Sequence, residues 1–148
     1  MKFDVIILAG GLGTRLASVV KDVPKPMAPV ADKPFLDHIL NALPQGHVNK
    51  IILAVGYKSE KVINYYGDNF EETPIVYSLE DEPLGTGGGI GLALNHVTQD
   101  TALILNGDTF FDVNYEDFWQ IHKDSNAPIT SALKQMQSPD RYGTVLME

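Results

Sequence analysis

The sequence contains no cysteine, few basic residues and no long apolar run, and each shortage removes a class of protein. The lack of cysteine excludes disulfides, thiolate nucleophiles and Cys-ligated zinc, and favours a cytoplasmic location. Because 11 Lys and Arg residues stand against 19 Asp and Glu, the net charge of -8 makes nucleic acid and anionic membranes poor partners. The N-terminal apolar stretch, residues 5–9, is too short for a signal peptide or a membrane span.

Short apolar runs alternate with amphipathic stretches along the 148 residues, a length typical of one domain. The runs are continuous, which is typical of strands buried on both faces, and they lie at 3–9, 50–55, 74–79 and 101–106. Helical spacing of apolar residues is found at 34–43, 59–70, 88–97 and 115–123. This alternation predicts an α/β protein of the three-layer, Rossmann-like kind, with a mainly parallel central sheet and ligands at the carboxyl ends of its strands.

Further segments carry weaker expectations. Four prolines in residues 21–34 predict a stiff, extended loop, and the composition of residues 128–136 and 144–148 predicts strands. Helical spacing predicts core positions for three aromatic side chains, Tyr115, Phe118 and Trp119. Four histidines lack the spacing of metal ligands, so we expect surface or core roles for His38, His47, His96 and His122.

The segment AGGLGTRL (9–16) directly follows the first predicted strand and is rich in glycine. A turn of this kind presents several backbone N–H groups to one anion, for which phosphate is the natural candidate. It matches neither known phosphate loop, because the dinucleotide fingerprint needs glycine at Leu16 and the Walker pattern is absent. Arg15 supplies a cationic fork suited to phosphate oxygens. The alternative is a tight strand-to-helix turn that carries a surface arginine.

Five blocks of sequence resemble the sugar-1-phosphate nucleotidyltransferase family. They occur in the family's order from end to end of the chain: AGGLGTRL (9–16), PKPMAPV (24–30), DKPFLDHIL (32–40), EPLGTGGGI (82–90) and NGDTFFD (106–112). Within the family, the strings RLASVVKDVPKPMAPV and EPLGTGGGI are similar to those of guanylyltransferases that act on D-glycero-D-manno-heptose 1-phosphate. The resemblance implies a nucleotidyltransferase fold for the predicted sheet.

The activity implied by this resemblance is nucleotidyl transfer from an NTP to a sugar 1-phosphate, with release of pyrophosphate. A sugar phosphate is already an anion near neutral pH, so no general base is needed, and the task is to bring two polyanions together. The resemblance implies catalytic roles for Arg15 and Lys25 on the phosphates and for Asp108 as a ligand of Mg²⁺. It implies nucleotide contacts for Leu8, Ala9, Gly10, Gly11, Gly13, Thr14, Arg15, Lys25, Glu80, Pro83, Gly85 and Thr86, and sugar-phosphate contacts for Asn106, Tyr142 and Gly143.

Glu80 bears on the choice of base, because many thymidylyl and uridylyl members of the family resemble one another in carrying glutamine at the matching place. Guanine presents two adjacent donors, N1–H and N2–H, to which a carboxylate can bond with both oxygens. Uracil and thymine present one donor between two carbonyl oxygens, which a carboxylate would repel. The pattern therefore favours GTP. The alternative is a Glu80 side chain solvated at a strand end.

Simpler interpretations stay open for the other residues as well. Lys25 could be a solvated loop lysine, Asp108 could cap the following turn, and the glycines of residues 85–91 could serve helix packing. Asp112 is a weaker candidate for a second carboxylate near the metal.

Three rival functions also remain. Within the family the acceptor could be mannose 1-phosphate, or the base uracil or thymine. A nucleotide-binding regulatory module without catalysis is a second class. A dehydrogenase is disfavoured by Leu16 and by the lack of an acidic residue closing the strand at 50–55. Family members continue past the matching segment with an E-K pair and a second metal-binding aspartate, so we expect residues 1–148 to form one nucleotidyltransferase domain without the C-terminal acceptor-binding portion.

Overall fold

The computed structural model describes residues 2–11, 22–44, 46–137 and 143–145, and the chain divides into two compact units, 1–111 and 112–148. The first unit contains the strands β1 (Phe3–Leu8), β2 (Pro29–Val30), β3 (Lys33–Pro34), β4 (Val48–Val55), β5 (Asn69–Phe70), β6 (Thr73–Leu79) and β7 (Ala102–Asn106). Its helices are η1 (Lys25–Met27, a 3-10 turn), α1 (Phe35–Ala42), α2 (Ser59–Tyr66) and α3 (Gly85–Leu94). The second unit contains α4 (Tyr115–Ser125). None of the helices in the described ranges has the length and apolar composition needed to cross a membrane.

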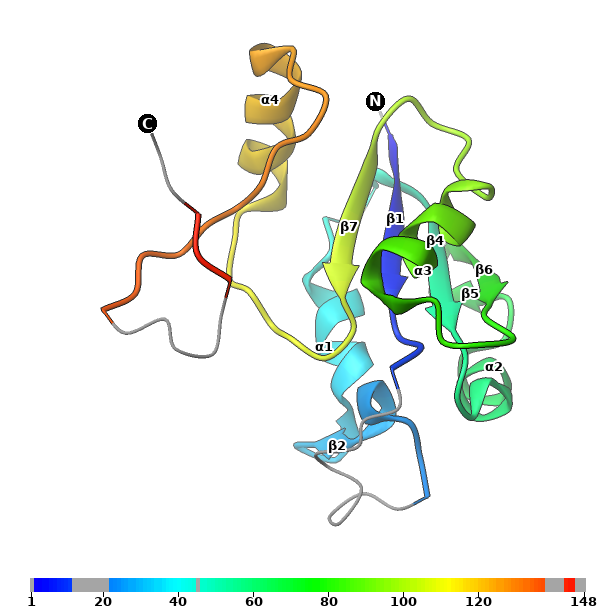
Figure 1. Cartoon of the computed structure of the whole chain (residues 1–148). Coiled ribbons are helices and arrows are strands. Elements are labelled where there is room, and N and C mark those ends of the chain that lie inside the picture. Colours follow the sequence, from blue (N-terminus) through cyan, green and yellow to red (C-terminus); the bar gives the residue numbers. More distant parts are fainter. Residues whose placement is uncertain (1, 12–21, 45, 138–142, 146–148) are drawn as a thin grey trace. The chain divides into compact units, whose positions relative to one another are not determined.

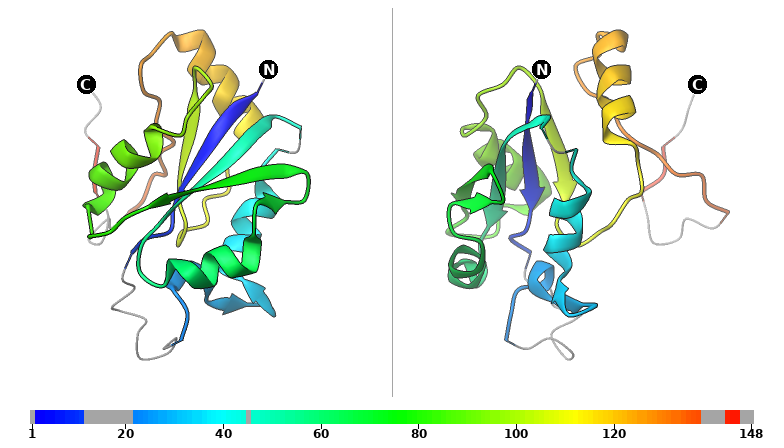
Figure 2. Two further views of the ribbon diagram at one scale, coloured as in Figure 1. Left: turned by 90° about the vertical axis from the view of Figure 1, so that its right-hand side faces the viewer. Right: turned by 180° about the vertical axis from the view of Figure 1, so that it is seen from behind.

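The first unit is an α/β fold with a mainly parallel sheet, as the sequence predicts. The five-stranded sheet has the order β5-β6-β4-β1-β7, and only β5 runs antiparallel to its neighbour (Figure 1). The helices α1 and α2 lie on one face and α3 on the other (Figure 2). This arrangement follows from right-handed crossovers, because the chain moves outward from β1 to β4 and β6 and then returns past β1 to β7. The strand order therefore reverses beside β1.

The core of the first unit comes from the continuous apolar runs in β1 and β4. Val5, Ile6 and Ile7 are fully buried, since α1 and α3 cover opposite faces of the sheet. On the α3 face, Ile6 packs with Ile52 and Ala54 of β4 and with Ala93 of α3. Burial of each large aliphatic side chain contributes roughly 1.5–3 kcal/mol relative to its exposure, which is why these runs form the central strands.

The helices α1 and α2 are joined by a partly buried hydrogen bond. The hydroxyl of Tyr66 donates to Asp37 Oδ1 at 2.6 Å, and the Tyr66 side chain is 8% exposed. Burial raises the pKa of the Tyr66 phenol, and the hydrogen bond to the Asp37 carboxylate raises it further. The phenol therefore stays protonated and keeps the two helices in place on their face of the sheet.

A fully buried carboxylate, Asp4 of β1, fixes the connection from α3 to β7. Its Oδ1 accepts from Asn49 Nδ2 at 2.8 Å, and its Oδ2 accepts from the backbone N–H groups of Thr98 (2.6 Å) and Gln99 (3.2 Å) and from the Thr98 hydroxyl (3.2 Å). A buried charge is tolerated where several donors satisfy it. Asp4 thereby sets where β7 begins.

The segment 21–34, expected to be an extended loop, is folded into a 3-10 turn and a short hairpin over its described part. The backbone N–H of Met27 donates to the carbonyl of Pro24 at 2.8 Å, which closes η1. The strands β2 and β3 pair antiparallel around Ala31 and Asp32, whose φ angles are 49° and 65°. The prolines restrict φ without straightening the chain, so the prediction of an extended loop is wrong.

Two helix boundaries also differ from those predicted. The helix expected at 59–70 ends at Tyr66, because Gly67 takes a φ of 60° and residues 69–70 form β5. The helix expected at 88–97 begins at Gly85 and ends at Leu94. The start of α3 was predicted too late because four glycines lie at its N-terminal end, and glycine has a low helix propensity.

In the second unit, α4 begins and ends with local polar signals. The side chain of Asn114 accepts from the N–H groups of Glu116 and Asp117 at 3.1 and 3.2 Å, and Asn126, the residue after the helix, takes a φ of 50°. No described residue of α4 is buried, so the predicted core placement of Tyr115, Phe118 and Trp119 is wrong: all three are half-buried.

The strand predicted at 128–136 does not form. Residues 128–136 carry no strand pairing, and Ile129 is 80% exposed. A strand needs a partner for its backbone groups, and the described residues of the second unit offer none. Of the strand predicted at 144–148, residues 144 and 145 are not in a strand and the remainder lies outside the described residues.

We expect Asp4→Asn to destabilise the first unit strongly. An amide carries no charge and turns an NH₂ group toward some of the donors, so about 1.5–3 kcal/mol per lost charge-assisted bond is at stake. Urea unfolding of Asp4→Asn beside Asp100→Asn, an exposed site in the same connection, measures the effect. Equal unfolding midpoints for the two variants would contradict the role given to Asp4.

Candidate active site at the carboxyl edge of the sheet

The candidate site lies where β1 and β7 end, at the reversal of strand order. Ligands of open α/β sheets bind at such switch points, outside the carboxyl ends of the strands. The backbone N–H of Gly107 donates to the carbonyl of Leu8 at 2.8 Å, and a Cβ at Gly107 would lie 2.8 Å from that same oxygen. Only glycine permits this approach. It brings the residue after Gly107, Asp108, to the end of β1.

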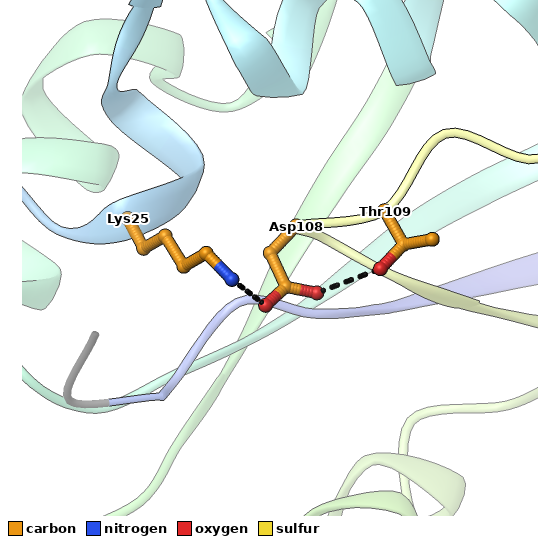
Figure 3. Close-up of polar contacts among 3 residues, drawn as sticks. All are labelled: Lys25, Asp108 and Thr109. Atoms are coloured by element: carbon orange, nitrogen blue, oxygen red, sulfur yellow. Dashed lines mark hydrogen bonds and ion pairs between the residues drawn. The ribbon is translucent and has the colours of Figure 1, made fainter. Parts of the chain in front are cut away.

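Lys25 and Asp108 form an ion pair across 83 positions of sequence, between Lys25 Nζ and Asp108 Oδ2 (Figure 3). The lysine is held by η1, whose Pro26 and Met27 are buried and anchor the turn. Asp108 Oδ1 accepts from the Thr109 hydroxyl at 3.1 Å. The two charged side chains are 34% and 39% exposed, so they are fixed in place yet open to a ligand.

The electrostatics of this pair keep Asp108 ionised. Burial raises the pKa of the Asp108 carboxyl, but the hydrogen bond and the charge of Lys25 lower it, as do bonds from Thr109 and the backbone, and the net pKa is lowered. An anionic oxygen beside a cation is therefore present at neutral pH. Such an oxygen is the ligand type that hard divalent cations prefer.

The glycine-rich loop begins at the same edge. The N–H of Ala9 donates to the carbonyl of Ala54 at 2.8 Å, which extends β1 by one residue along β4. Gly11 is exposed and has nothing within 4 Å of a built Cβ, whereas Gly10 packs against Glu80. The remaining predicted loop residues, Gly13, Thr14 and Arg15, lie outside the described residues, so their phosphate role stays a prediction.

Glu80 lies at the neighbouring strand end, one residue beyond β6. Its backbone N–H donates to the carbonyl of Val55 at 2.8 Å, and its Oε2 accepts from the N–H of Leu84 at 3.2 Å. This bond holds the 80–84 turn ahead of α3. Other residues predicted to contact nucleotide, Pro83, Gly85 and Thr86, are exposed, and Gly85 takes a φ of 69°.

The predicted sugar-phosphate residues are divided between the units. Asn106 is the last residue of β7, opposite Leu8, and is exposed at the carboxyl edge. Gly143 belongs to the second unit, as does Asp112, and Tyr142 lies outside the described residues. No group of three acidic or histidine side chains suited to a metal ion occurs in the ranges that the structure describes.

The side chains of His38 and His122 make local hydrogen bonds. His38 Nε2 lies 2.9 Å from the carbonyl oxygen of Val30, and His122 Nδ1 lies 2.8 Å from the Thr130 hydroxyl. Sequence reasoning overlooked Thr109, which bonds to Asp108, and Gly107, which places it. The role of Gly107 could have been recognised from its position directly before Asp108, the candidate metal ligand.

The fold and this edge define an α/β protein of the Rossmann-like, nucleotide-handling kind. The family model for nucleotidyl transferases matches residues 4–148, and the chain belongs to that family. It is 51% identical over 96% of its length to D-glycero-alpha-D-manno-heptose 1-phosphate guanylyltransferase of Campylobacter jejuni, and 46% identical over 97% to the enzyme of that name from Aneurinibacillus thermoaerophilus. The chain spans 62% of the length of each.

A solved structure agrees with this membership. HddC from Yersinia pseudotuberculosis, crystallised with GMP-PN, superposes with a TM-score of 0.73 at 41% identity, over 82% of this chain and 55% of that one. The resemblance to sugar-1-phosphate nucleotidyltransferases, and within them to the heptose guanylyltransferases, is therefore confirmed.

Removing the lysine charge should raise the pKa of Asp108. In Lys25→Met the burial that opposes ionisation remains, while the largest lowering influence is gone. The pair stabilises the fold above the ordinary carboxyl range and loses that contribution as pH falls through the lowered pKa, so the variant should also lose this pH dependence. Carboxyl ¹³C NMR titration checks it, with Lys33→Met, an exposed hairpin lysine, as control. An unchanged Asp108 titration would rule out the pairing.

Proposed function

We propose that this chain carries the nucleotidyl-transfer site of a sugar-1-phosphate guanylyltransferase. The reaction is GTP plus D-glycero-D-manno-heptose 1-phosphate giving the GDP-sugar and pyrophosphate. The observation that carries the proposal is the Lys25 and Asp108 pair beside the end of β1, where the glycine-rich loop begins. The names of the two heptose relatives and the GMP-PN in the HddC crystal support the acceptor and the base.

The chemistry needs placement and charge more than proton transfer. The acceptor phosphate attacks the α-phosphorus in line, and the P–O bond to the pyrophosphate leaving group breaks. The amides that begin at Gly10 and Gly11, with Arg15, would hold the triphosphate, and Lys25 would neutralise oxygens around the α-phosphorus. These positive groups stabilise the transition state most where negative charge increases during the displacement.

Asp108 fits a divalent cation, because it is ionised, partly exposed and already carries a positive group on Oδ2. Mg²⁺ held by Asp108 would offset the negative charge of the substrate phosphates. Lys25, which pairs with Asp108, would place its positive charge near the substrate phosphates. The acidic chain, with a net charge of -8, depends on these few positive groups to hold two polyanions.

Glu80 would read the base from the end of β6. Its carboxylate is positioned by the bond from the Leu84 N–H and lies beside Gly10, where the nucleotide loop starts. Guanine offers N1–H and N2–H to such a group, whereas uracil and thymine would set a carbonyl oxygen against it. This difference underlies the preference for GTP.

The change Asp108→Asn should lower Mg²⁺-dependent pyrophosphate release by about 10²- to 10³-fold, since an amide of the same size carries no charge for a hard cation. Asp32→Asn, in the exposed hairpin turn, is the control and should keep full activity. Activity of the Asp108 variant at ordinary Mg²⁺ would place the metal elsewhere. GTP binding without any pyrophosphate release, in a protein that includes the acceptor-binding portion, would instead favour the regulatory module.

The change Glu80→Gln should reduce the preference for GTP over UTP. A bidentate base contact is worth about 1–3 kcal/mol, which corresponds to roughly 5- to 150-fold in the ratio of affinities. Calorimetry with both nucleotides measures it, and Glu82→Gln, an exposed neighbour, provides the control. If Glu80→Gln and Glu82→Gln keep the same preference, Glu80 does not read the base. A preference for UTP in the unaltered protein would favour the uridylyl alternative.

A further inference from the structure

We propose that Gly89 of α3 is a specificity-determining residue, because its missing side chain leaves the space that the Glu80 carboxylate occupies. The inference rests on the proposed reading of guanine by Glu80. Glycines from three separate segments pack against Glu80: Gly10 after β1 and Gly89 in α3 approach its carboxylate, and Gly56 after β4 lies against its Cβ and backbone carbonyl. We call them the glycine cradle.

The alternation of side chains in the sheet directs Glu80 toward α3. Ser78 of β6 lies opposite Ala54 of β4, and Ala54 packs with Ala93 on the α3 face. Glu80 is two residues beyond Ser78, so it emerges on the same face. Gly89 lies one helical turn before Ala93 and is therefore the part of α3 that Glu80 meets.

The contact at Gly89 is closer than a side chain would allow. A Cβ built there would lie 2.9 Å from Glu80 Oε1 and 3.6 Å from its Cδ. The Glu80 carboxylate, the far end of a flexible side chain, is the group that an added methyl group would displace. It would have to swing away, and that movement strains the 3.2 Å bond from Leu84 N–H to Oε2.

Local backbone geometry does not account for the glycine. Gly89 is not among the glycines of positive φ, which are Gly46, Gly67 and Gly85 within the described residues. Inside a helix, glycine costs about 1 kcal/mol relative to alanine. Gly91 of the same helix has nothing within 4 Å of a built Cβ, and a Cβ at Gly88 would meet Leu84, so the contact with Glu80 is particular to position 89 among these glycines.

If the glycine cradle has this role, Gly89→Ala should reduce the preference for GTP without lowering the stability of the fold. Alanine at 89 favours the helix and displaces the far end of a flexible side chain, so the fold should survive. The displaced carboxylate, however, should no longer match the two donors of guanine. A purely structural glycine would behave in the opposite way, with lost stability and unchanged base preference.

The test compares Gly89→Ala with Gly91→Ala, which adds the same methyl group to the same helix in open space. Calorimetry with GTP and UTP and thermal unfolding are measured for both. We expect Gly89→Ala to bind GTP roughly tenfold more weakly, to bind UTP unchanged and to melt no lower than the unaltered protein, since small misplacements in a site cost up to about 10²-fold. Gly91→Ala should keep the GTP affinity.

Two further measurements separate the possible failures. In a protein that already carries Glu80→Ala, adding Gly89→Ala should not change the affinity for GTP further. The NMR resonance of the Leu84 amide should shift in Gly89→Ala but not in Gly91→Ala. If Glu80→Gln loses the GTP preference and Gly89→Ala keeps it, the role proposed for Gly89 is wrong and the proposed function is unaffected. Glu80→Gln that keeps the preference would overturn the base reading itself. A lowered melting temperature in Gly89→Ala would assign Gly89 to structure.

Discussion

The close approach of two backbones, at Leu8 and Gly107, is the constraint on which the site depends. A single hydrogen bond joins the last residue of β1 to the residue after β7, and a Cβ at Gly107 would collide with its acceptor. The strand order reverses at this place, and such a reversal leaves room for a ligand outside the carboxyl ends of the strands. This approach places Asp108 next to Lys25, which lies in η1.

The central strands β1 and β4 were predictable because they are buried on both faces, whereas β6 is only partly buried and β7 has no buried residue. Continuous runs such as that of β1 need no knowledge of their neighbours to be recognised, and β4, β6 and β7 follow within two residues of their predicted bounds. Errors arose where local propensity and tertiary context disagree. The prolines of 21–34 accommodate η1 and a hairpin, and the apolar residues of 128–136 find no strand partner among the described residues of their unit.

In the candidate site, the charged residues could be predicted from the sequence, whereas the residues that leave steric room for them could not. Lys25 and Asp108 were recognisable from their motifs, and the structure brings them into contact. Gly89 was not, because a glycine within a glycine-rich run carries no sign of which member a distant side chain approaches. Asp4 was likewise missed, since its partners at Thr98 and Gln99 lie more than ninety positions away. Steric room and buried polar bonds are properties of the folded arrangement.

The composition of α3 has a consequence for the order in which the molecule assembles. Five of its ten residues are glycine, and at about 1 kcal/mol for each glycine such a segment has no helical stability of its own. It becomes a helix only when Ala93 and its neighbours dock on a sheet whose β1 and β4 are already paired. The α3 crossover therefore cannot nucleate folding, and β7 joins the sheet after the β1 and β4 core has formed. The carboxyl edge that carries the candidate site therefore forms after the β1 and β4 core.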